Sequence, residues 1–307
     1  MAMTSFRQRL FRLYAWNVQK PALALIRNRH IARRMFTASS MILARTPKGF
    51  RQEQITLGTR PAAVCATGHP TPNGTTLYLH GGGFVLGDLR GYRHLVARIG
   101  KASGTRAIFL DYRLAPEHPF PAALDDAEAA WRALAADPGA GPLTLAGDSA
   151  GGNLTLALLH RILRKGLVRP AAVAAICPVT DLRLTNPSLE GNRRRDALVS
   201  TRWGARAIDA YLADADPAQP DASPLMGDFT GAPPVLIHTD RTEVLYDDAR
   251  LMADRLRRQG VDVTLTETEG LTHVWHFNVG RTREADTAVA EIGKFLARAT
   301  APDPPPA

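Results

Sequence analysis

Apolar residues in this 307-residue chain occur in two patterns, short continuous runs and stretches with helical spacing. Continuous runs bounded by Gly, Pro or Asn predict buried strands, and apolar residues every three to four positions predict helices. The runs predict eight strands, at 54–57, 61–66, 75–79, 106–110, 143–146, 171–177, 235–238 and 261–266. The helical stretches lie near 90–102, 121–136, 151–165, 245–259 and 283–298. Apolar strands separated by helices indicate an α/β fold, a mostly parallel sheet with helices on both faces.

The first part of the chain does not follow this alternation. Residues 5–45 have helical spacing, and one helical face would carry Phe6, Leu10, Leu13 and Trp16. Pro21 should break or restart the helix, because proline lacks the N–H that a helix interior uses. Pro47, Lys48 and Gly49 then end the segment.

A second irregular stretch sets the expected domain organisation. Residues 182–217 contain a long polar loop and then a helix from Trp203 to Leu212. We expect a helical cap segment at 1–50 and a catalytic domain at 51–300 that carries this stretch as a cap insertion. The proline-rich end, 301–307, is expected to be disordered.

The positive charge of the chain is concentrated at its beginning. Residues 1–51 contain eleven Lys/Arg and no Asp/Glu, whereas the remainder has 27 basic and 29 acidic side chains. This segment is either a solvated face on capping helices or a surface for acidic lipid headgroups. Nucleic-acid binding is not expected, because no recognition motif accompanies the charge.

Targeting signals and cysteine pairing are the next features to weigh. The apolar stretch Pro21–Ile26 is too short for a signal peptide or a membrane span. Cys65 and Cys177 are expected to be buried free thiols, with a disulfide between them as the alternative. Few cysteines fit a cytoplasmic location.

A glycine-rich turn after the strand 143–146 carries the first candidate chemistry. Gly147-Asp148-Ser149-Ala150-Gly151 has the pattern G-x-S-x-G and precedes a predicted helix. In this strand–turn–helix context the serine is exposed as a nucleophile, and the following helix directs its positive end towards it. A plain glycine turn is the alternative. We expect Ser149 to attack a carbonyl group.

A second glycine run follows the strand 75–79, in His80-Gly81-Gly82-Gly83-Phe84. Acyl transfer passes through a tetrahedral oxyanion, which preorganised backbone N–H groups stabilise. We expect the oxyanion hole to use the N–H groups of Gly81 and Gly82, with that of Ala150 as a third. A phosphate loop is the alternative, but no Lys-Ser/Thr follows the glycines.

A serine nucleophile needs a base, and the base needs an acid that fixes its tautomer. His273 follows the last predicted strand, in a loop that would reach the carboxyl edge of the sheet, and His276 is its rival. No metal is expected at these two histidines, because no further ligand cluster accompanies them. Candidate acids follow the strand 235–238, namely Asp240, Glu243, Asp247 and Asp248. The last two are also typical of a helix N-terminus.

Together these motifs resemble the bacterial hormone-sensitive-lipase family of α/β-hydrolases. The resemblance covers about residues 54–298 and rests on the two glycine motifs, on Glu243-Val244-Leu245-Tyr246-Asp247-Asp248, on His273 and on Asp111-Tyr112-Arg113-Leu114-Ala115-Pro116-Glu117-His118-Pro119-Phe120-Pro121-Ala122. It implies the α/β-hydrolase fold, with Ser149 as nucleophile, Glu243 as acid and His273 as base. The family's acid is most often Asp, and here Glu243 holds that position. The block 111–122 is implied to support the site without reacting.

The expected activity is therefore hydrolysis of short- to medium-chain carboxylic esters through an acyl-enzyme, without metal or cofactor. A small-molecule ester is the expected partner, and the resemblance makes the last strand and helix a candidate homodimer surface. Candidate lid side chains over the acyl pocket are Trp16, Phe36 and Trp203. A non-catalytic receptor on the same fold and an acyltransferase are the alternatives. The receptor reading is weakened by the presence of His273, because receptors that resemble this family have lost the base.

Overall fold

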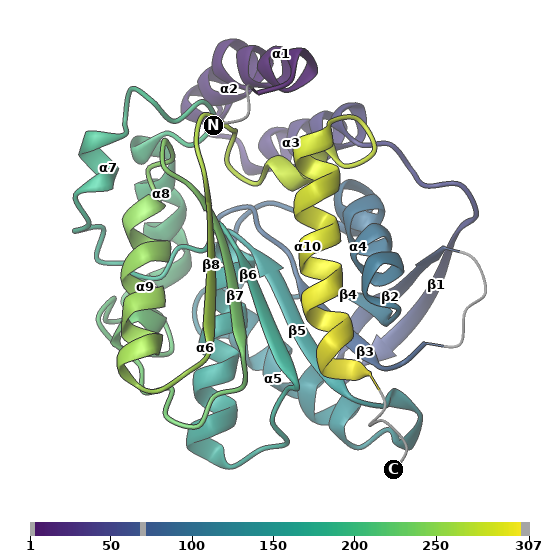
Figure 1. Ribbon diagram of the computed structural model, residues 1–307. Coiled ribbons are helices and arrows are strands. Elements are labelled where there is room, and N and C mark those ends of the chain that lie inside the picture. Colours follow the sequence, from purple (N-terminus) through teal and green to yellow (C-terminus); the bar gives the residue numbers. More distant parts are fainter. Residues whose placement is uncertain (1–3, 68–71, 302–307) are drawn as a thin grey trace.

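Short apolar runs form one eight-stranded sheet in the computed structural model, which describes residues 4–67 and 72–301 (Figure 1). The spatial order of the strands is β1-β2-β4-β3-β5-β6-β7-β8. β1 pairs antiparallel with β2, and β2 with β4, while all other pairs are parallel. The strands are β1 (Phe50–Leu57), β2 (Arg60–Thr67), β3 (Thr75–Leu79), β4 (Arg106–Leu110), β5 (Leu143–Asp148), β6 (Ala172–Ile176), β7 (Val235–Asp240) and β8 (Val263–Thr268). The predicted mostly parallel sheet is confirmed.

Helices cover both faces of this sheet, because its central strands are apolar on both sides. In β3, Leu77 and Leu79 contribute to the core on one face and Tyr78 to the core on the other. One face is covered by α5 (Ala122–Ala135), α6 (Ala150–Lys165) and α9 (Tyr246–Arg258). The other face is covered by α4 (Leu89–Ser103) and α10 (Arg283–Thr300), which pack against each other. The short 3₁₀ segments are η2 (Pro138–Ala140), η3 (Pro224–Met226) and η4 (Trp275–Asn278).

The N-terminal segment is helical as predicted, but its break lies elsewhere. Helical structure runs without interruption through α1 (Phe6–Tyr14), the π-helical turn η1 (Ala15–Gln19) and α2 (Lys20–Leu25), and resumes in α3 (Arg29–Leu43). Of the two outcomes expected at Pro21, a break or a restart of the helix, the structure shows the restart, because α2 begins at Lys20 with Pro21 in its first turn. The wider π-helical turn precedes Pro21, and such a turn relieves the clash of a proline ring with the preceding turn. The chain instead turns at residues 26–28, where Asn28 caps α3.

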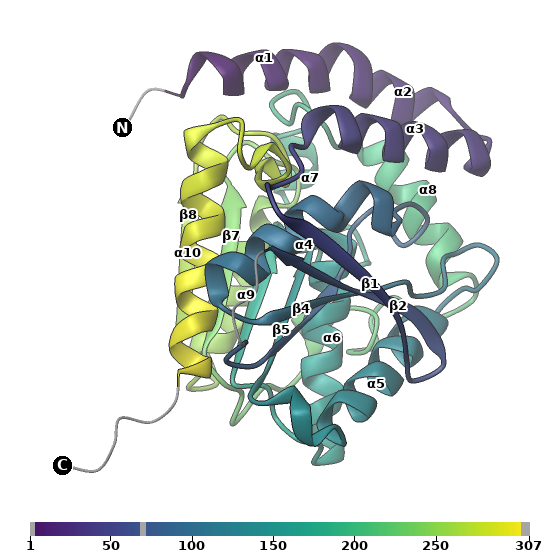
Figure 2. The ribbon, with the colours of Figure 1, turned by 90° about the vertical axis from the view of Figure 1, so that its right-hand side faces the viewer.

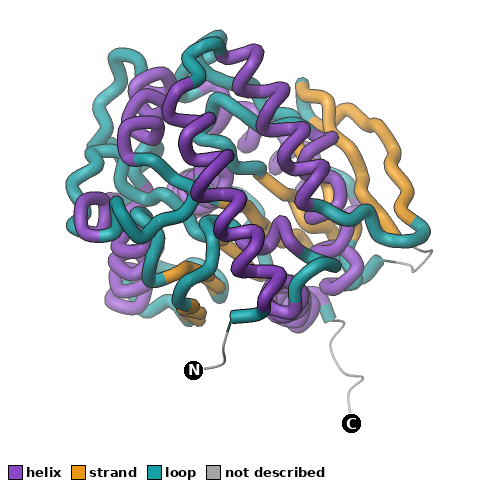
Figure 3. Tube along the Cα trace, turned by 90° about the horizontal axis from the view of Figure 1, so that it is seen from above, coloured by secondary structure: helices purple, strands orange, loops and turns teal. Residues whose placement is uncertain are grey.

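Two regions distant in sequence meet above the carboxyl ends of the strands (Figure 2). Residues 182–217 carry α7 (Ser188–Gly191) and α8 (Thr201–Leu212), which confirms the helix predicted from Trp203. Arg206 of α8 donates to two carbonyl groups in the last turn of α2, those of Leu23 and Ala24, at 3.1 and 2.9 Å. Seen from above, helices and loops cross the strands (Figure 3). The two parts are thus joined into one cover, while the predicted domain boundaries stay predictions.

Two sequence expectations concern the periphery of the fold. Both Cys65 and Cys177 are buried and free. Apart from Ala301, the tail predicted to be disordered lies outside the described residues. Within 4–67 and 72–301, no helix combines the length and the apolar character needed to cross a membrane.

Candidate active site

Ser149 lies at a sharp turn between β5 and α6. Its backbone has φ +54° and ψ −118°, a conformation that side-chain-bearing residues rarely adopt. A side chain at Gly151 would collide with the carbonyl groups of Leu79 and His80, so the close approach of α6 to β3 requires glycine there. The N–H of Ser149 donates to Ile176 O at 2.8 Å. The turn thereby has the geometry of a nucleophile elbow.

Glu243 and His273 meet on the loops that follow β7 and β8. Nδ1 of His273 lies 2.6 Å from Oε2 of Glu243, and both side chains are buried. The other carboxylate oxygen, Oε1, accepts hydrogen bonds from Thr239 Oγ1 at 2.6 Å and from the N–H of Asp240 at 2.9 Å. The carboxylate is therefore fixed on both oxygens. With Nδ1 donating to Glu243, Nε2 of His273 is left to accept a proton.

The pKa values of this pair move apart. Burial lowers the pKa of His273, but the hydrogen bond to Glu243 and its negative charge outweigh burial and raise it above its ordinary value. Burial raises the pKa of Glu243, but the hydrogen bond and charge of His273 outweigh it and lower the pKa. The acid thus stays ionised while the base becomes readily protonated, which is the arrangement that general base catalysis needs.

The structure distinguishes among the candidate acids. Asp240 accepts hydrogen bonds from Thr242 and from the N–H groups of Gly270 and Leu271, so it holds together the two loops that carry Glu243 and His273. Asp247 and Asp248 lie in the first turn of α9, as expected for helix-terminal charges, and bind the backbone of residues 180–188. Of the four candidates, only Glu243 has a hydrogen bond to His273 in the described part of the chain.

His276, which was the rival base, is buried in the protein interior, as are His238 and His80. Nε2 of His276 lies 3.0 Å from Nδ1 of His238, and both rings are buried. Burial is the largest cause of the lowered pKa of each ring. His80 is stacked on Tyr112 with ring centroids 4.2 Å apart, and burial lowers its pKa to about 4. Among the described residues, none of these three histidines lines the cavities beside Ser149.

Cys177, Glu243 and His273 are close enough to be considered as a metal site, with ligand atoms within 4.8 Å of one another. A metal would require the thiolate of Cys177, but burial and the charge of Glu243 raise the pKa of this thiol well above its ordinary value. Glu243 is also already bonded on both oxygens. These donors fit a hydrogen-bonded acid–base pair beside a neutral thiol better than they fit a metal ion.

The glycine loop after β3 differs from the prediction in one donor. The N–H of Gly81 donates to Oδ1 of Asp148 at 3.0 Å, so this group is not free to bind an oxyanion. Among the described residues, the N–H groups of Gly82, Gly83 and Ala150 have no acceptor. All three residues line the cavities that Ser149 also lines. The positive φ of Gly82, +111°, turns the chain at this point. The N–H groups available to bind an oxyanion are therefore those of Gly82, Gly83 and Ala150, whereas the N–H of Gly81 holds the loop against Asp148.

Asp148 supports the same loop from within the elbow. Its carboxylate also accepts hydrogen bonds from Tyr78 Oη at 2.8 Å and Tyr92 Oη at 3.0 Å. Burial raises the pKa of Asp148 to about 6, against the opposing effect of these hydrogen bonds. The residue beside Ser149 thus ties the glycine loop to the elbow.

Two cavities meet at Ser149. The larger has a volume of about 590 Å³ and is lined by Trp203, Leu184, Leu189 and Ile208 among others. The smaller, of about 80 Å³, is also lined by His273 and reaches α1, α2 and α3 through Phe11, Leu23 and Phe36. Of the candidate lid side chains, Trp203 and Phe36 line these cavities. Trp16 lines neither and is 40% exposed.

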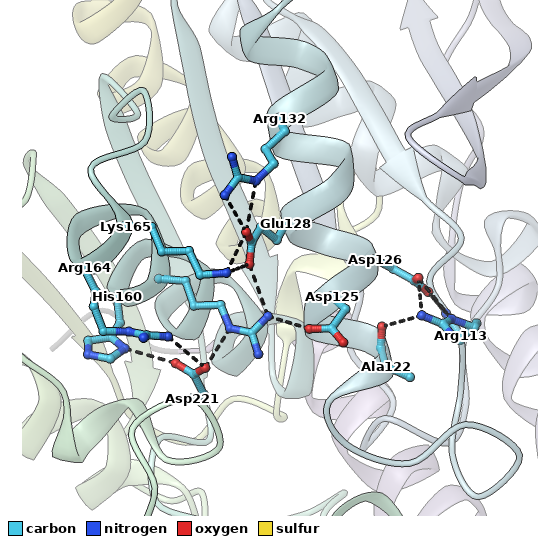
Figure 4. A network of polar contacts seen from close by, with 11 residues as sticks. Arg113, Ala122, Asp125, Asp126, Glu128, Arg132, His160, Arg164, Lys165 and Asp221 are labelled. Carbon is cyan, nitrogen blue, oxygen red and sulfur yellow. Dashed lines mark hydrogen bonds and ion pairs between the residues drawn. The ribbon is translucent and has the colours of Figure 1, made fainter.

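A polar network fixes the helices behind the elbow (Figure 4). Arg161 of α6 donates to Asp125 at 2.6 Å, to Asp221 at 2.7 Å and to Glu128 at 3.3 Å. In the block 111–122, Arg113 donates through Nη2 and Nε to Asp126 at 2.7 and 3.0 Å. This block binds α5 and contributes no side chain to the two cavities, in agreement with the supporting role that the resemblance implied.

One buried acid near the site was not identified from the sequence. Asp196, in the cap insertion, accepts hydrogen bonds from the N–H groups of Leu198, Val199 and Val244. Burial raises its pKa, against the charge of His273 nearby. It ties the insertion to the residue that follows Glu243. No local pattern marks this aspartate, because it lies in a polar loop among arginines.

Comparisons with known proteins agree with this geometry. The sequence model of a family described as having the alpha/beta hydrolase fold matches residues 76–277. The chain is 40% identical over 255 residues to an acetyl-hydrolase of Streptomyces hygroscopicus, covering 80% of this chain and 85% of that protein. It is 34% identical to the putative acetyl-hydrolase LipR of Mycobacterium tuberculosis (strain ATCC 25618 / H37Rv), covering 90% of each. A crystal structure of an esterase from the bacterial hormone-sensitive lipase (HSL) family superposes with a TM-score of 0.90 at 32% identity, over 98% of this chain and 100% of that one.

Proposed function

This chain belongs to the alpha/beta hydrolase fold family and is an ester hydrolase of its bacterial hormone-sensitive-lipase branch, and we propose that Ser149, Glu243 and His273 are its nucleophile, acid and base. The observation that carries this assignment is the 2.6 Å contact between His273 and Glu243, in a cavity that the His273 ring shares with Ser149.

In the first half of the reaction, Oγ of Ser149 attacks the ester carbonyl carbon while Nε2 of His273 takes the hydroxyl proton. The carbonyl oxygen becomes negative, and the N–H groups of Gly82, Gly83 and Ala150 stabilise it. The imidazolium is stabilised by Glu243. When the tetrahedral intermediate collapses, the carbon–oxygen bond to the alcohol breaks and His273 returns its proton to the leaving alkoxide.

In the second half, His273 takes a proton from water, and the resulting hydroxide attacks the acyl-enzyme. The second oxyanion occupies the same hole. Collapse breaks the bond to Ser149, which regains its proton from His273, and the carboxylic acid leaves. The loop contact between Gly81 and Asp148 keeps the hole in place through both steps.

Short- to medium-chain esters are the proposed substrates. The larger cavity, of about 590 Å³, is within the range of small-molecule sites and is lined mainly by apolar side chains. The names of the relatives, acetyl-hydrolases among them, agree with small acyl groups. A rate profile over p-nitrophenyl esters of increasing chain length tests this, and a maximum at long chains would contradict it.

The test of the nucleophile is Ser149→Ala. Hydrolysis of a short p-nitrophenyl ester should fall by several orders of magnitude, to the level that binding and the oxyanion hole alone supply. Labelling of the unmodified protein by a fluorophosphonate should be lost in the variant, and the two proteins should unfold at the same temperature. Retained turnover in a folded variant would exclude Ser149.

Fluorophosphonate labelling tests the receptor alternative, and product analysis tests the acyltransferase alternative. A non-catalytic receptor would not be labelled by a fluorophosphonate, and His273 bonded to Glu243 favours reactivity instead. An acyltransferase would give ester products when alcohols are added, whereas a hydrolase gives the free acid.

Three further proposals concern the location of the protein, its oligomeric state and its contact with a membrane. We propose a cytoplasmic location on the basis of the two free thiols, a homodimer through the edge strand β8 with α10, and contact between the basic N-terminal segment and a membrane surface. Size-exclusion chromatography with light scattering tests the dimer.

A further inference from the structure

Exposed apolar side chains are concentrated in one part of the molecule. In the described part of the chain, eleven large apolar side chains are exposed, and ten of them lie between residues 6 and 42. Leu25 is 77% exposed, Phe6 74% and Ile42 63%. The remaining one is Val168, on the loop after α6. Clustered exposure of this kind is typical of an interaction surface, whereas scattered apolar residues are normal.

Helical geometry places these side chains on the outer side of the cap. Phe6, Leu10 and Leu13 follow the spacing i, i+4, i+7 and share one face of α1, while Gln8 and Ala15 are buried on the inner side. Ile31, Met35 and Ile42 likewise share a face of α3. α1 and α2 form the uppermost layer of the molecule, with α3 below them (Figure 2). We call the exposed apolar and basic side chains of residues 6–42 the cap face.

The charges of the cap face indicate what covers it. Residues 1–51 have eleven basic and no acidic side chains. Arg29 and Arg33 are paired with Glu117 of the catalytic domain, but Arg9, Arg27 and Arg34 are exposed and have no acidic partner among the described residues. Arg9 lies between Phe6 and Leu13 on the helix, and Arg34 follows Ile31 by three positions, so cations adjoin the apolar stripes.

We propose that the cap face docks the protein on an anionic lipid surface. Apolar side chains of α1–α3 enter the boundary between headgroups and acyl chains, and the free arginines bind the negative headgroups. A second copy of this chain fits less well, because a symmetric contact would oppose two strongly positive segments. A nucleic acid would neutralise the arginines and leave the apolar stripes in water.

The interior of the cap connects this face with the catalytic site. An apolar cavity of about 250 Å³ lies among α1, α2 and α3, and its lining includes Ile26, Met35 and Ile42. It shares Gln19, Leu23, Phe36 and Leu198 with the small cavity that contains Ser149 and His273. A lipophilic ester could therefore pass from the lipid surface to Ser149 between the cap helices.

The docking is tested with the Ser149→Ala protein, so that the result does not depend on turnover or on the proposed function. Co-flotation with vesicles of phosphatidylcholine is compared with vesicles that also contain phosphatidylglycerol, at low and high salt. We expect binding to the anionic vesicles alone, weakened by salt. The triple variant Arg9→Gln, Arg27→Gln, Arg34→Gln should bind about 100-fold more weakly, about five-fold for each charge. Leu25→Ser should weaken binding about ten-fold.

Two matched controls keep the test specific. Lys101→Gln, Lys294→Gln, Arg298→Gln removes three exposed cations from α4 and α10, and Val168→Ser removes the exposed apolar side chain outside the cap. Both should bind like the parent protein. Equal loss in controls and cap variants, equal binding to neutral vesicles, or no binding at low salt would overturn the proposal. Self-association that is lost in Leu25→Ser would overturn it in favour of a second copy.

Discussion

Arginine side chains of the catalytic domain and of the N-terminal cap differ in burial and in pairing with acidic groups. Behind the elbow, Arg161 is 9% exposed and bonded to three carboxylates. On the cap, Arg9, Arg27 and Arg34 are exposed without an acidic partner among the described residues. A desolvated arginine must be paired, because an isolated charge in a low-dielectric interior is costly, whereas a solvated one needs no partner. The first kind holds the fold in place, and the second leaves charge available for a partner.

Apolar residues show the same contrast. In the catalytic domain, apolar side chains fill two cores, one on each side of the sheet. Of the eleven large apolar side chains that are exposed in the described part of the chain, ten lie in the cap. The cap is held to the rest of the protein by polar contacts, such as Lys20 donating to the carbonyl of Asp196 at 2.6 Å, and by Phe36, which is stacked on Tyr92. We infer that rigidity belongs to the catalytic domain and binding surface to the cap, and the following predictions test this division.

The largest effect is expected at the acid of the catalytic domain. Glu243→Gln should lower kcat by about 10³- to 10⁴-fold, because the base loses the charge that orients it and stabilises its protonated form. Glu243→Asp, which keeps a carboxylate, should retain more activity than Glu243→Gln. Steady-state kinetics on a short p-nitrophenyl ester measure both. Similar rates for Glu243→Gln and the parent enzyme would mean that another acid serves His273.

The next effect is on stability. Arg161→Met should lower the free energy of unfolding by about 2 kcal/mol, because three carboxylates lose a charged hydrogen-bond donor that is only 9% exposed. Glu128 and Asp221 each keep other basic partners, so neither becomes an unpaired buried charge. Arg164 approaches the same Asp221 at 3.5 Å but is 55% exposed, so Arg164→Met should cost less than about 1 kcal/mol. Urea denaturation of both variants gives the difference, and equal losses would contradict the division between buried and exposed arginines.

The pH dependence of kcat/KM follows from the paired site. His273 must be neutral to act as base, and its pKa lies above the ordinary value, so activity should fall about ten-fold per pH unit below that raised pKa. Glu243, whose pKa is lowered, stays ionised throughout this range. In Glu243→Gln the acidic limb of the residual activity should move to lower pH, since the negative charge is gone. A limb that stays in place would assign it to another group.

The smallest effect is expected on the cap. The variant Arg9→Gln, Arg27→Gln, Arg34→Gln should change the free energy of unfolding by less than about 0.5 kcal/mol per site. Its kcat/KM for a water-soluble short ester should equal that of the parent enzyme. Thermal unfolding and initial rates measure both. A clear loss of stability would show that these arginines belong to the structural framework after all.

Local patterns predicted most of the sheet and part of the site. The strands at 75–79 and 106–110 agree to the residue, because each contains a short apolar run that is followed at once by a polar residue, His80 or Asp111. The strand at 235–238 extends to Asp240, whose polar side chain gave no strand signal. At Pro21 the helix restarts and does not break, and the π-helical turn that precedes this restart leaves no mark in the sequence.

The sequence by itself determined the alternation of strands and helices, the serine turn, the glycine loop and the uneven charge, since each depends on neighbours along the chain. The tertiary structure alone decided which acid meets His273, that Gly81 is occupied by Asp148, and that Asp196 joins the insertion to the site. It also decided that the apolar stripes of residues 6–42 face outward. Such contacts join residues that are distant in the chain, and the direction of a side chain follows from how whole elements pack.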